Sequence, residues 1–274
     1  MKNGKTVAKG KLPARDYGQG LSQAGKLSIP LDKLPAPARY QLHLRLGTTG
    51  YQNNYPLWLY PDQVDTMPPS TVTLRDAWDE GTQELLRSGK TVLLIPPLEK
   101  IPGIDGYFTP DFWNYTMFRS ISVGNKKPVP PGTLGLLIDA GHPALADFPT
   151  ETHSNWQWWD LVMGSRSLVL DATPASFRPI VQVIDNSDRN QKLGVLFEAK
   201  VDKGKLLVCT LDLLKKQDSP VARQMLYSLL QYGATASPRN TLSMETVNTL
   251  FAPAKKVIQK RPDGSFSEFF ERKE

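Results

Sequence analysis

The sequence predicts an α/β fold built on a mostly parallel sheet with flanking helices, preceded by a short β segment. Beyond residue 70, short apolar strands alternate with helical segments, and this alternation is typical of parallel α/β sheets. Residues 91–95 form a continuous apolar run, as expected for a strand that is buried on both faces. A length of 274 residues is sufficient for one large domain or two smaller ones.

Residues 1–61 read as β structure. Apolar and polar residues alternate in residues 5–12, 26–31 and 40–46, and residues 51–60 add an aromatic strand. About four strands fall short of the roughly seven in a complete immunoglobulin-like sandwich, so we expect a partial sandwich. The proline-rich residues 62–70 are expected to be a linker to the α/β part.

The α/β domain is expected over residues 71–252. Asp76 is the expected cap of its first helix, and Asp218 or Ser219 caps a later helix that has Pro220 near its start. Residues 201–204 carry a hairpin turn signal. Strands are predicted at 71–74, 91–95, 134–138, 168–170, 180–184, 193–199 and 205–211, and helices at 77–87, 156–163, 220–232 and 241–251. Residues 253–274 read as a polar tail.

The composition of the chain argues against several classes of function. The 33 Lys and Arg exceed the 27 Asp and Glu by six, and they are spread along the chain rather than gathered in the patch typical of nucleic-acid binders. The sequence contains no apolar run of the roughly 18–20 residues that a membrane span needs. One cysteine and three histidines argue against a disulfide, a zinc site or another metal centre, and no motif calls for a cofactor. The first ten residues lack the apolar core of a signal peptide.

Two kinds of side chain in this sequence could be catalytic. Cys209 could be a nucleophile, but it lies inside an apolar strand run and has no neighbouring glycine, so we expect an inert buried thiol. Paired carboxylates could indicate glycoside hydrolysis. Six acids near strand ends qualify, and nothing in their spacing selects a pair: Asp139, Asp160, Asp171, Asp185, Glu198 and Asp212.

The most unusual stretch is a tryptophan cluster. Trp156, Trp158 and Trp159 follow His153 and Asn155 within seven residues. Exposed indole rings stack on sugar rings while neighbouring polar groups bind hydroxyls, but helical spacing could equally bury the rings in a core. Since Trp156 and Trp159 lie three residues apart on the predicted helix, we expect them to share a buried face, with Trp158 nearer the surface.

A second aromatic cluster surrounds Trp113, between Phe112 and Asn114. The same two interpretations apply to it. If these rings bind carbohydrate, the candidate binding residues are Trp113, His153, Asn155, Trp156, Trp158 and Trp159.

Several long motifs resemble the C-terminal region of bacterial family 2 glycoside hydrolases, the β-galactosidase-like enzymes. They include GKTVLLIPP (89–97), GTLGLLID (132–139), HSNWQWW (153–159), RPIVQVID (178–185) and LGVLFE (193–198). The aromatic strand ending at Pro61 is similar to the last strand of an immunoglobulin-like domain in these enzymes. The resemblance extends over residues 5–235.

The resemblance implies an accessory region rather than a catalytic one. The catalytic glutamates of this family lie on a TIM barrel of about 250 residues, for which this chain has no room. It implies an amidotransferase-like or flavodoxin-like α/β domain with an architectural or oligomerisation role. It also implies a catalytic barrel domain as partner and a bacterial parent enzyme that is periplasmic or secreted.

Three hypotheses therefore remain open. The chain is a non-catalytic accessory module of a glycoside hydrolase, a module that binds polysaccharide through its tryptophans, or a small independent hydrolase. Exposure of the tryptophan rings distinguishes the first two, and exposure of Cys209 beside a histidine would favour the third.

Overall fold

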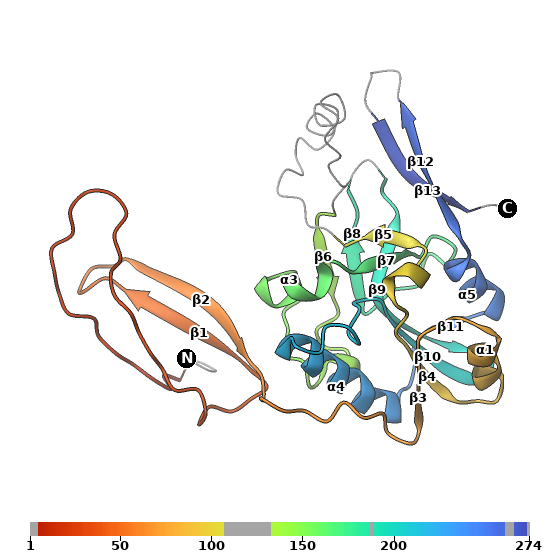
Figure 1. Ribbon diagram of the computed structural model, residues 1–274, viewed down its shortest axis with the longest axis horizontal. Coiled ribbons are helices and arrows are strands. Elements are labelled where there is room, and N and C mark those ends of the chain that lie inside the picture. Colours follow the sequence, from red (N-terminus) through yellow and green to blue (C-terminus); the bar gives the residue numbers. More distant parts are fainter. Residues whose placement is uncertain (1–4, 107–132, 187–188, 261–265, 273–274) are drawn as a thin grey trace. The chain divides into compact units, whose positions relative to one another are not determined.

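Two compact units, Met1–Pro61 and Asp62–Glu274, make up the chain. The structure is a computed structural model that describes residues 5–106, 133–186, 189–260 and 266–272 (Figure 1). No helix in these ranges is both long enough and apolar enough to cross a membrane.

The first unit is built around one β-hairpin. Strand β1 (Ala38–Arg45) pairs antiparallel with β2 (Gln52–Leu59), so that Ala38 lies opposite Leu59. The strands expected at residues 5–12 and 26–31 do not form, and most side chains in those segments are exposed. Alternation of apolar and polar residues makes a strand only where a hydrogen-bonded neighbour and a covered face are available. The described residues of this unit therefore form a hairpin, and the prediction of a partial immunoglobulin-like sandwich was wrong.

The second unit is built on one sheet of nine strands with a branched order. The path runs β3-β4-β10-β9-β7-β5, while β8 and β11 also pair with β9, and β6 pairs with β8. The strands are β3 (Val72–Arg75), β4 (Thr91–Leu94), β5 (Gly103–Asp105), β6 (Gly135–Ile138), β7 (Arg166–Val169), β8 (Val181–Ile184), β9 (Lys192–Val201), β10 (Gly204–Cys209) and β11 (Thr241–Leu242).

The sheet is mixed and predominantly antiparallel, so the predicted flavodoxin-like, mostly parallel fold was wrong. Only the β3–β4, β4–β10 and β9–β11 pairs are parallel among the described strands. The five remaining pairs, β5–β7, β6–β8, β7–β9, β8–β9 and β9–β10, are antiparallel.

The turn between β9 and β10 shows the local reason for the difference. Val201 pairs with Gly204 across a two-residue loop, as the turn signal predicted. Asp202 adopts a φ of 53°, in the left-handed region that Asp tolerates better than most residues. A loop this short can connect only antiparallel strands, because a parallel connection needs a crossover of a dozen or more residues.

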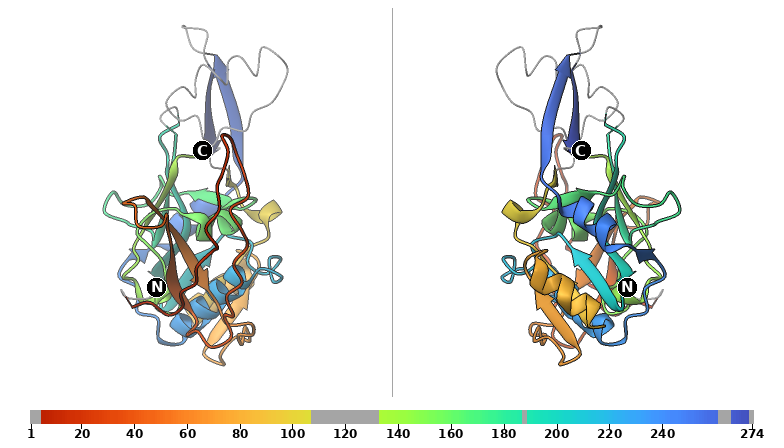
Figure 2. Two further views of the ribbon diagram at one scale, coloured as in Figure 1. Left: turned by 90° about the vertical axis from the view of Figure 1, so that its left-hand side faces the viewer. Right: turned by 90° about the vertical axis from the view of Figure 1, so that its right-hand side faces the viewer.

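Four α-helices among the described residues cover the sheet. They are α1 (Glu80–Arg87), α3 (Trp156–Val162), α4 (Pro220–Thr235) and α5 (Met244–Phe251). The short 3₁₀ helices η1 (Leu98–Lys100) and η3 (Pro143–Leu145) lie in loops. Figure 2 shows α1 and α5 on one side of the strands. On the other face, α4 approaches β3 so closely that a Cβ on Gly233 would lie 2.9 Å from a methyl group of Val72.

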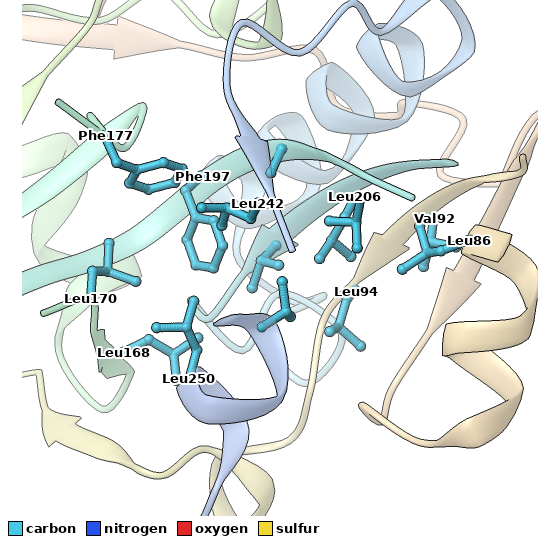
Figure 3. Packing of buried hydrophobic residues seen from close by; sticks show 14 of the residues in the cluster. Leu86, Val92, Leu94, Leu168, Leu170, Phe177, Phe197, Leu206, Leu242 and Leu250 are labelled. Atoms are coloured by element: carbon cyan, nitrogen blue, oxygen red, sulfur yellow. The ribbon is translucent and has the colours of Figure 1, made fainter. Parts of the chain in front are cut away.

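The main hydrophobic core lies between the sheet and helices α1 and α5. Leu86 of α1 and Leu250 of α5 pack with strand residues such as Leu94, Phe197 and Leu206, all of which are buried (Figure 3). Residues of β4 and β10 that point to the opposite face, Leu93 and Leu207, are also buried. Both faces of the β4–β10 region are therefore covered, which explains why these strands read as continuous apolar runs.

The segment predicted as a polar tail contains two strands that pair as a hairpin. Strands β12 (Ala254–Lys260) and β13 (Phe266–Arg272) pair antiparallel as a separate two-stranded sheet. Both segments contain β-branched or aromatic residues of the kind enriched in strands, and this signal was missed.

Candidate functional site

Helix α3 carries the tryptophan cluster and begins at a well-formed cap. The Oδ1 atom of Asn155 accepts a hydrogen bond of 3.0 Å from the backbone N–H of Gln157. Its Nδ2 donates to Glu151 over 3.1 Å. Asn155 therefore orients the helix, and both ends of its amide are engaged in the fold rather than presented to a ligand.

The buried ring of the cluster is Trp158, which is 0% exposed. Its indole packs edge-on against Phe148, with ring centroids 5.5 Å apart. The Nε1–H group donates to the Oγ1 atom of Thr150 over 2.8 Å, so the polar atom of the buried indole is satisfied. The expectation that Trp158 lies nearer the surface was wrong.

The exposed rings are Trp156 and Trp159, which are 77% and 43% exposed. They share one face of α3, as their spacing predicts, but this face points to solvent instead of the core. Their centroids lie 6.2 Å apart and the ring planes are tilted by 49°. The pair therefore presents an exposed aromatic surface with two differently inclined planes.

A titratable side chain lies just before this helix. His153 is 66% exposed, and its Nε2 atom lies 3.8 Å from a carboxylate oxygen of Glu151. It also forms an isolated β-bridge with Leu137 of β6, which fixes its backbone beside the sheet. The sixth candidate, Trp113, lies outside the described residues.

Three of the six candidate acids, Asp185, Glu198 and Asp212, are buried, and the first two lie in structural networks. Asp185 accepts from both Nε and Nη2 of Arg189, at 3.0 and 2.6 Å, and also from the backbone N–H groups of Asn186 and Gln191. The side chains of Arg189 and Asp185 are 1% and 2% exposed. The i,i+4 spacing of this pair was visible in the sequence, although the sequence analysis considered Asp185 without its partner.

Glu198 of β9 is the centre of the second buried network. Tyr232 of α4 donates to one carboxylate oxygen over 2.5 Å, and His142 lies 3.2 Å from the other. Because Nδ1 of His142 accepts from the backbone N–H of Ala144, its Nε2 carries the proton that is donated to Glu198. Burial acts to raise the pKa of Glu198, but the hydrogen bonds from His142 and Tyr232 outweigh it and lower the pKa.

This network ties β9 to α4 and to the loop after β6. All three side chains are nearly inaccessible, with exposures of 3% for Glu198, 5% for His142 and 7% for Tyr232. The two acceptor oxygens are directed at donors from the protein itself. The cluster is thus suited to stabilising the fold rather than to acting on a substrate.

The cysteine is as buried as the sequence analysis expected. Cys209 is 0% exposed at the end of β10, and burial raises the pKa of its thiol to about 12. A buried thiol with this pKa is protonated at neutral pH, which disfavours its action as a nucleophile.

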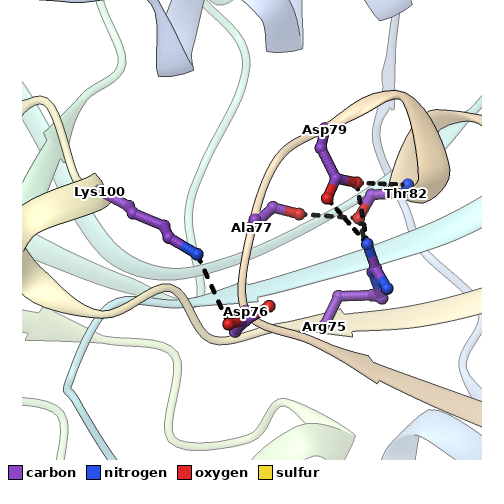
Figure 4. Close-up of polar contacts among 6 residues, drawn as sticks. All are labelled: Arg75, Asp76, Ala77, Asp79, Thr82 and Lys100. Carbon is purple, nitrogen blue, oxygen red and sulfur yellow. Dashed lines mark hydrogen bonds and ion pairs between the residues drawn. The ribbon is translucent and has the colours of Figure 1, made fainter.

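The carboxyl ends of the parallel strands β3, β4 and β10 are the usual place for a ligand in α/β sheets. Arg75, the last residue of β3, donates to both carboxylate oxygens of Asp79 over 2.9 Å and to Thr82 over 3.0 Å (Figure 4). The backbone N–H of Thr82 donates to Asp79 and is the largest cause of the lowered pKa of that carboxyl group. Asp79, rather than the predicted Asp76, therefore caps α1, and these side chains satisfy one another.

Among the described residues, no group of three or more His, Cys, Asp or Glu side chains is placed to hold a metal ion. Among the side chains that the structure describes in the second unit, the exposed aromatic rings are those of Trp156 and Trp159, and His153 precedes them in the sequence.

Comparison with protein families matches both parts of the chain. Residues 1–61 match a domain of unknown function, DUF8488, and residues 73–252 match a second domain of unknown function, DUF8487. A search of curated proteins found no match. Since the second match covers more than half of the 274 residues, the chain belongs to the DUF8487 family.

Proposed function

We propose that the chain is a non-catalytic accessory module of a β-galactosidase-like glycoside hydrolase, and that Trp156 and Trp159 bind carbohydrate for it. The observation that carries the proposal is the exposure of this pair on α3, at 77% and 43%. Large exposed apolar groups that lie together on a protein surface usually serve recognition.

The chemistry of the exposed face is suited to sugars. The axial C–H groups of a pyranose form an apolar surface that stacks on an indole ring, while its hydroxyl groups need polar partners. The 49° tilt between the rings matches two successive sugar units that are rotated relative to each other better than one flat surface. His153, two-thirds exposed, supplies a polar group near the start of the same helix.

The burial of Cys209, Asp185 and Glu198 supports a non-catalytic role. Cys209, Asp185 and Glu198 are inaccessible or are held by cationic and hydroxyl partners. Under this proposal the catalytic barrel of a parent enzyme is the partner, the module contributes to the architecture or oligomerisation of that enzyme, and the parent is periplasmic or secreted.

Affinity electrophoresis of the purified full chain tests the carbohydrate contact. We expect its migration to be slowed by at least one of four soluble polysaccharides in the gel, namely β-1,4-galactan, β-1,3-galactan, xylan and mixed-linkage β-glucan. Replacement of both exposed rings, Trp156→Ala with Trp159→Ala, should abolish the retardation because it removes both stacking surfaces. Tyr51→Ala is the matched control, since Tyr51 is 76% exposed in the other unit.

The result can contradict the proposal in two ways. Migration that is unchanged by all four polysaccharides would show that the pair is not a carbohydrate surface. Retardation that persists in the double variant would place binding elsewhere on the chain.

A further inference from the structure

The second unit has an open depression of about 480 Å³ on a different set of elements from the tryptophan pair. It is lined by residues of the loop that follows β7, by Gln182 of β8 and by Lys192 of β9. The side chains include two cations, one carboxylate and one amide. Asp171, Thr173, Arg178, Gln182 and Lys192 supply its polar groups.

Lys192 is anchored in this depression by its surroundings. Its Nζ atom donates to Thr173 Oγ1 over 3.0 Å and to the carbonyl oxygen of Pro174 over 2.9 Å. It also lies 5.4 Å from the ring centroid of Phe177, which is itself part of the buried core. Two of its three N–H donors are therefore committed and one remains for a ligand.

Arg178 brings a second positive charge to the same place. Its Nη1 atom donates to the carbonyl oxygens of Ala175 and Phe177, which fixes the guanidinium group. Burial, followed by the nearby charge of Arg178, lowers the pKa of Lys192. The two like charges repel each other, the carboxylate of Asp171 offsets part of the charge of Lys192, and an anion bound between the two cations would relieve the remaining repulsion.

Arg178, Gln182 and Asp171 have hydrogen-bond donors or acceptors left for a ligand. Within the described residues, the Nε and Nη2 atoms of Arg178 and the side-chain amide of Gln182 form no hydrogen bond. Asp171 uses its Oδ1 atom to accept from the backbone N–H of Lys192 over 2.8 Å, which leaves Oδ2 as an acceptor. A cationic fork is thus combined with an acceptor and an amide.

We propose that this depression binds a hydroxylated carboxylate, such as a sugar acid. The carboxylate would be held by the paired donors of Arg178 and the third N–H of Lys192, because a guanidinium fork matches the planar carboxylate geometry. The hydroxyl groups would donate to Oδ2 of Asp171 and exchange hydrogen bonds with Gln182. The site does not depend on the tryptophan pair and goes beyond the role proposed above.

Nuclear magnetic resonance of the ¹⁵N-labelled full chain tests the site. Sodium glucuronate is added at constant ionic strength, with sodium chloride removed to compensate, so that general screening does not change. We expect saturable shifts of the Arg178 Nε–H and the Gln182 side-chain amide signals. Acetate, which lacks hydroxyl groups, should bind more weakly, and glucose, which lacks the carboxylate, should cause no saturable shift.

Two variants and a control locate the binding. Arg178→Gln should weaken glucuronate binding about tenfold or more, the range expected for losing a charged hydrogen-bonding partner. Gln182→Leu removes an amide that has no polar partner among the described residues, so it tests the site even if Arg178→Gln disturbs the loop. Lys200→Gln, which removes one charge at an exposed position of β9, the strand of Lys192, should bind like the parent.

The double tryptophan variant distinguishes this site from the proposed carbohydrate surface. A chain that carries both Trp156→Ala and Trp159→Ala should still bind glucuronate. The assignment would be overturned by the absence of saturable shifts, by equal affinity for acetate and glucuronate, or by unchanged binding in both the Arg178 and Gln182 variants.

Discussion

Replacement of Trp158 by alanine is expected to lower the free energy of unfolding by about 3–5 kcal/mol, the cost typical of deleting a large buried aromatic side chain. The ring is 0% exposed, packs on Phe148 and donates to Thr150. The variant would lose these contacts and leave a cavity beneath α3. Urea unfolding followed by far-ultraviolet circular dichroism measures the loss.

Trp156→Ala is the matched control for this measurement. It removes the same side chain two positions earlier in the same helix, but Trp156 is 77% exposed, so we expect a change below about 1 kcal/mol. Equal losses in the two variants would contradict the placement of α3, because one face of the helix could not then be more buried than the other.

Replacement of Asp185 by asparagine is expected to cost about 3–5 kcal/mol, since it removes the negative charge from a buried, hydrogen-bonded ion pair with Arg189. The two side chains are 2% and 1% exposed, and the carboxylate accepts from backbone N–H groups as well as from the guanidinium. The same urea titration provides the measurement.

The exposed ion pair between Glu99 and Lys215 serves as the comparison. The two charged atoms lie 3.6 Å apart, and both side chains are at least 60% exposed. Glu99→Gln should therefore change the stability by less than about 1 kcal/mol. A loss at Asp185 no larger than the loss at Glu99 would mean that water reaches the Asp185–Arg189 pair.

The positions of most elements in the second unit could be predicted from local sequence signals. The continuous apolar run at residues 91–95 corresponds to β4, Pro220 marks the start of α4, and residues 201–204 make the turn between β9 and β10. Each signal depends on a few neighbouring residues. Residues 241–251 contain a short strand before α5 and were predicted as one helix, because two residues of β11 give too little pattern.

The pairing of the strands could not be predicted in the same way. A strand buried on both faces has the same apolar composition whether its neighbours are parallel or antiparallel. Strand β9 contacts β7, β8, β10 and β11, and its contacts with β7 and β11 join residues far apart in the sequence. The predicted alternation of strands and helices suggested parallel crossover connections. The chain between β7 and β8 contains no helix, although both strands belong to the same sheet.

Which tryptophan rings of α3 are buried could not be predicted from the local sequence either. Spacing indicates that Trp156 and Trp159 share a face, and the structure bears this out. Spacing cannot indicate which face of α3 meets the core. That depends on Phe148 and Thr150, whose positions relative to α3 are set by a preceding loop. Likewise, the partners of Glu198 come from α4 and from the loop after β6, and no local pattern joins them.

The indole N–H signals of the ¹⁵N-labelled chain provide the most direct test of the proposed carbohydrate surface. Each signal can be assigned by replacing one of the six tryptophans at a time. On titration with an oligosaccharide of the polysaccharide that retards the chain, the account predicts saturable shifts of the Trp156 and Trp159 signals, while the Trp158 signal, whose N–H is bonded to Thr150, stays in place. Unchanged Trp156 and Trp159 signals at saturating oligosaccharide, or shifts centred on other tryptophans, would contradict it.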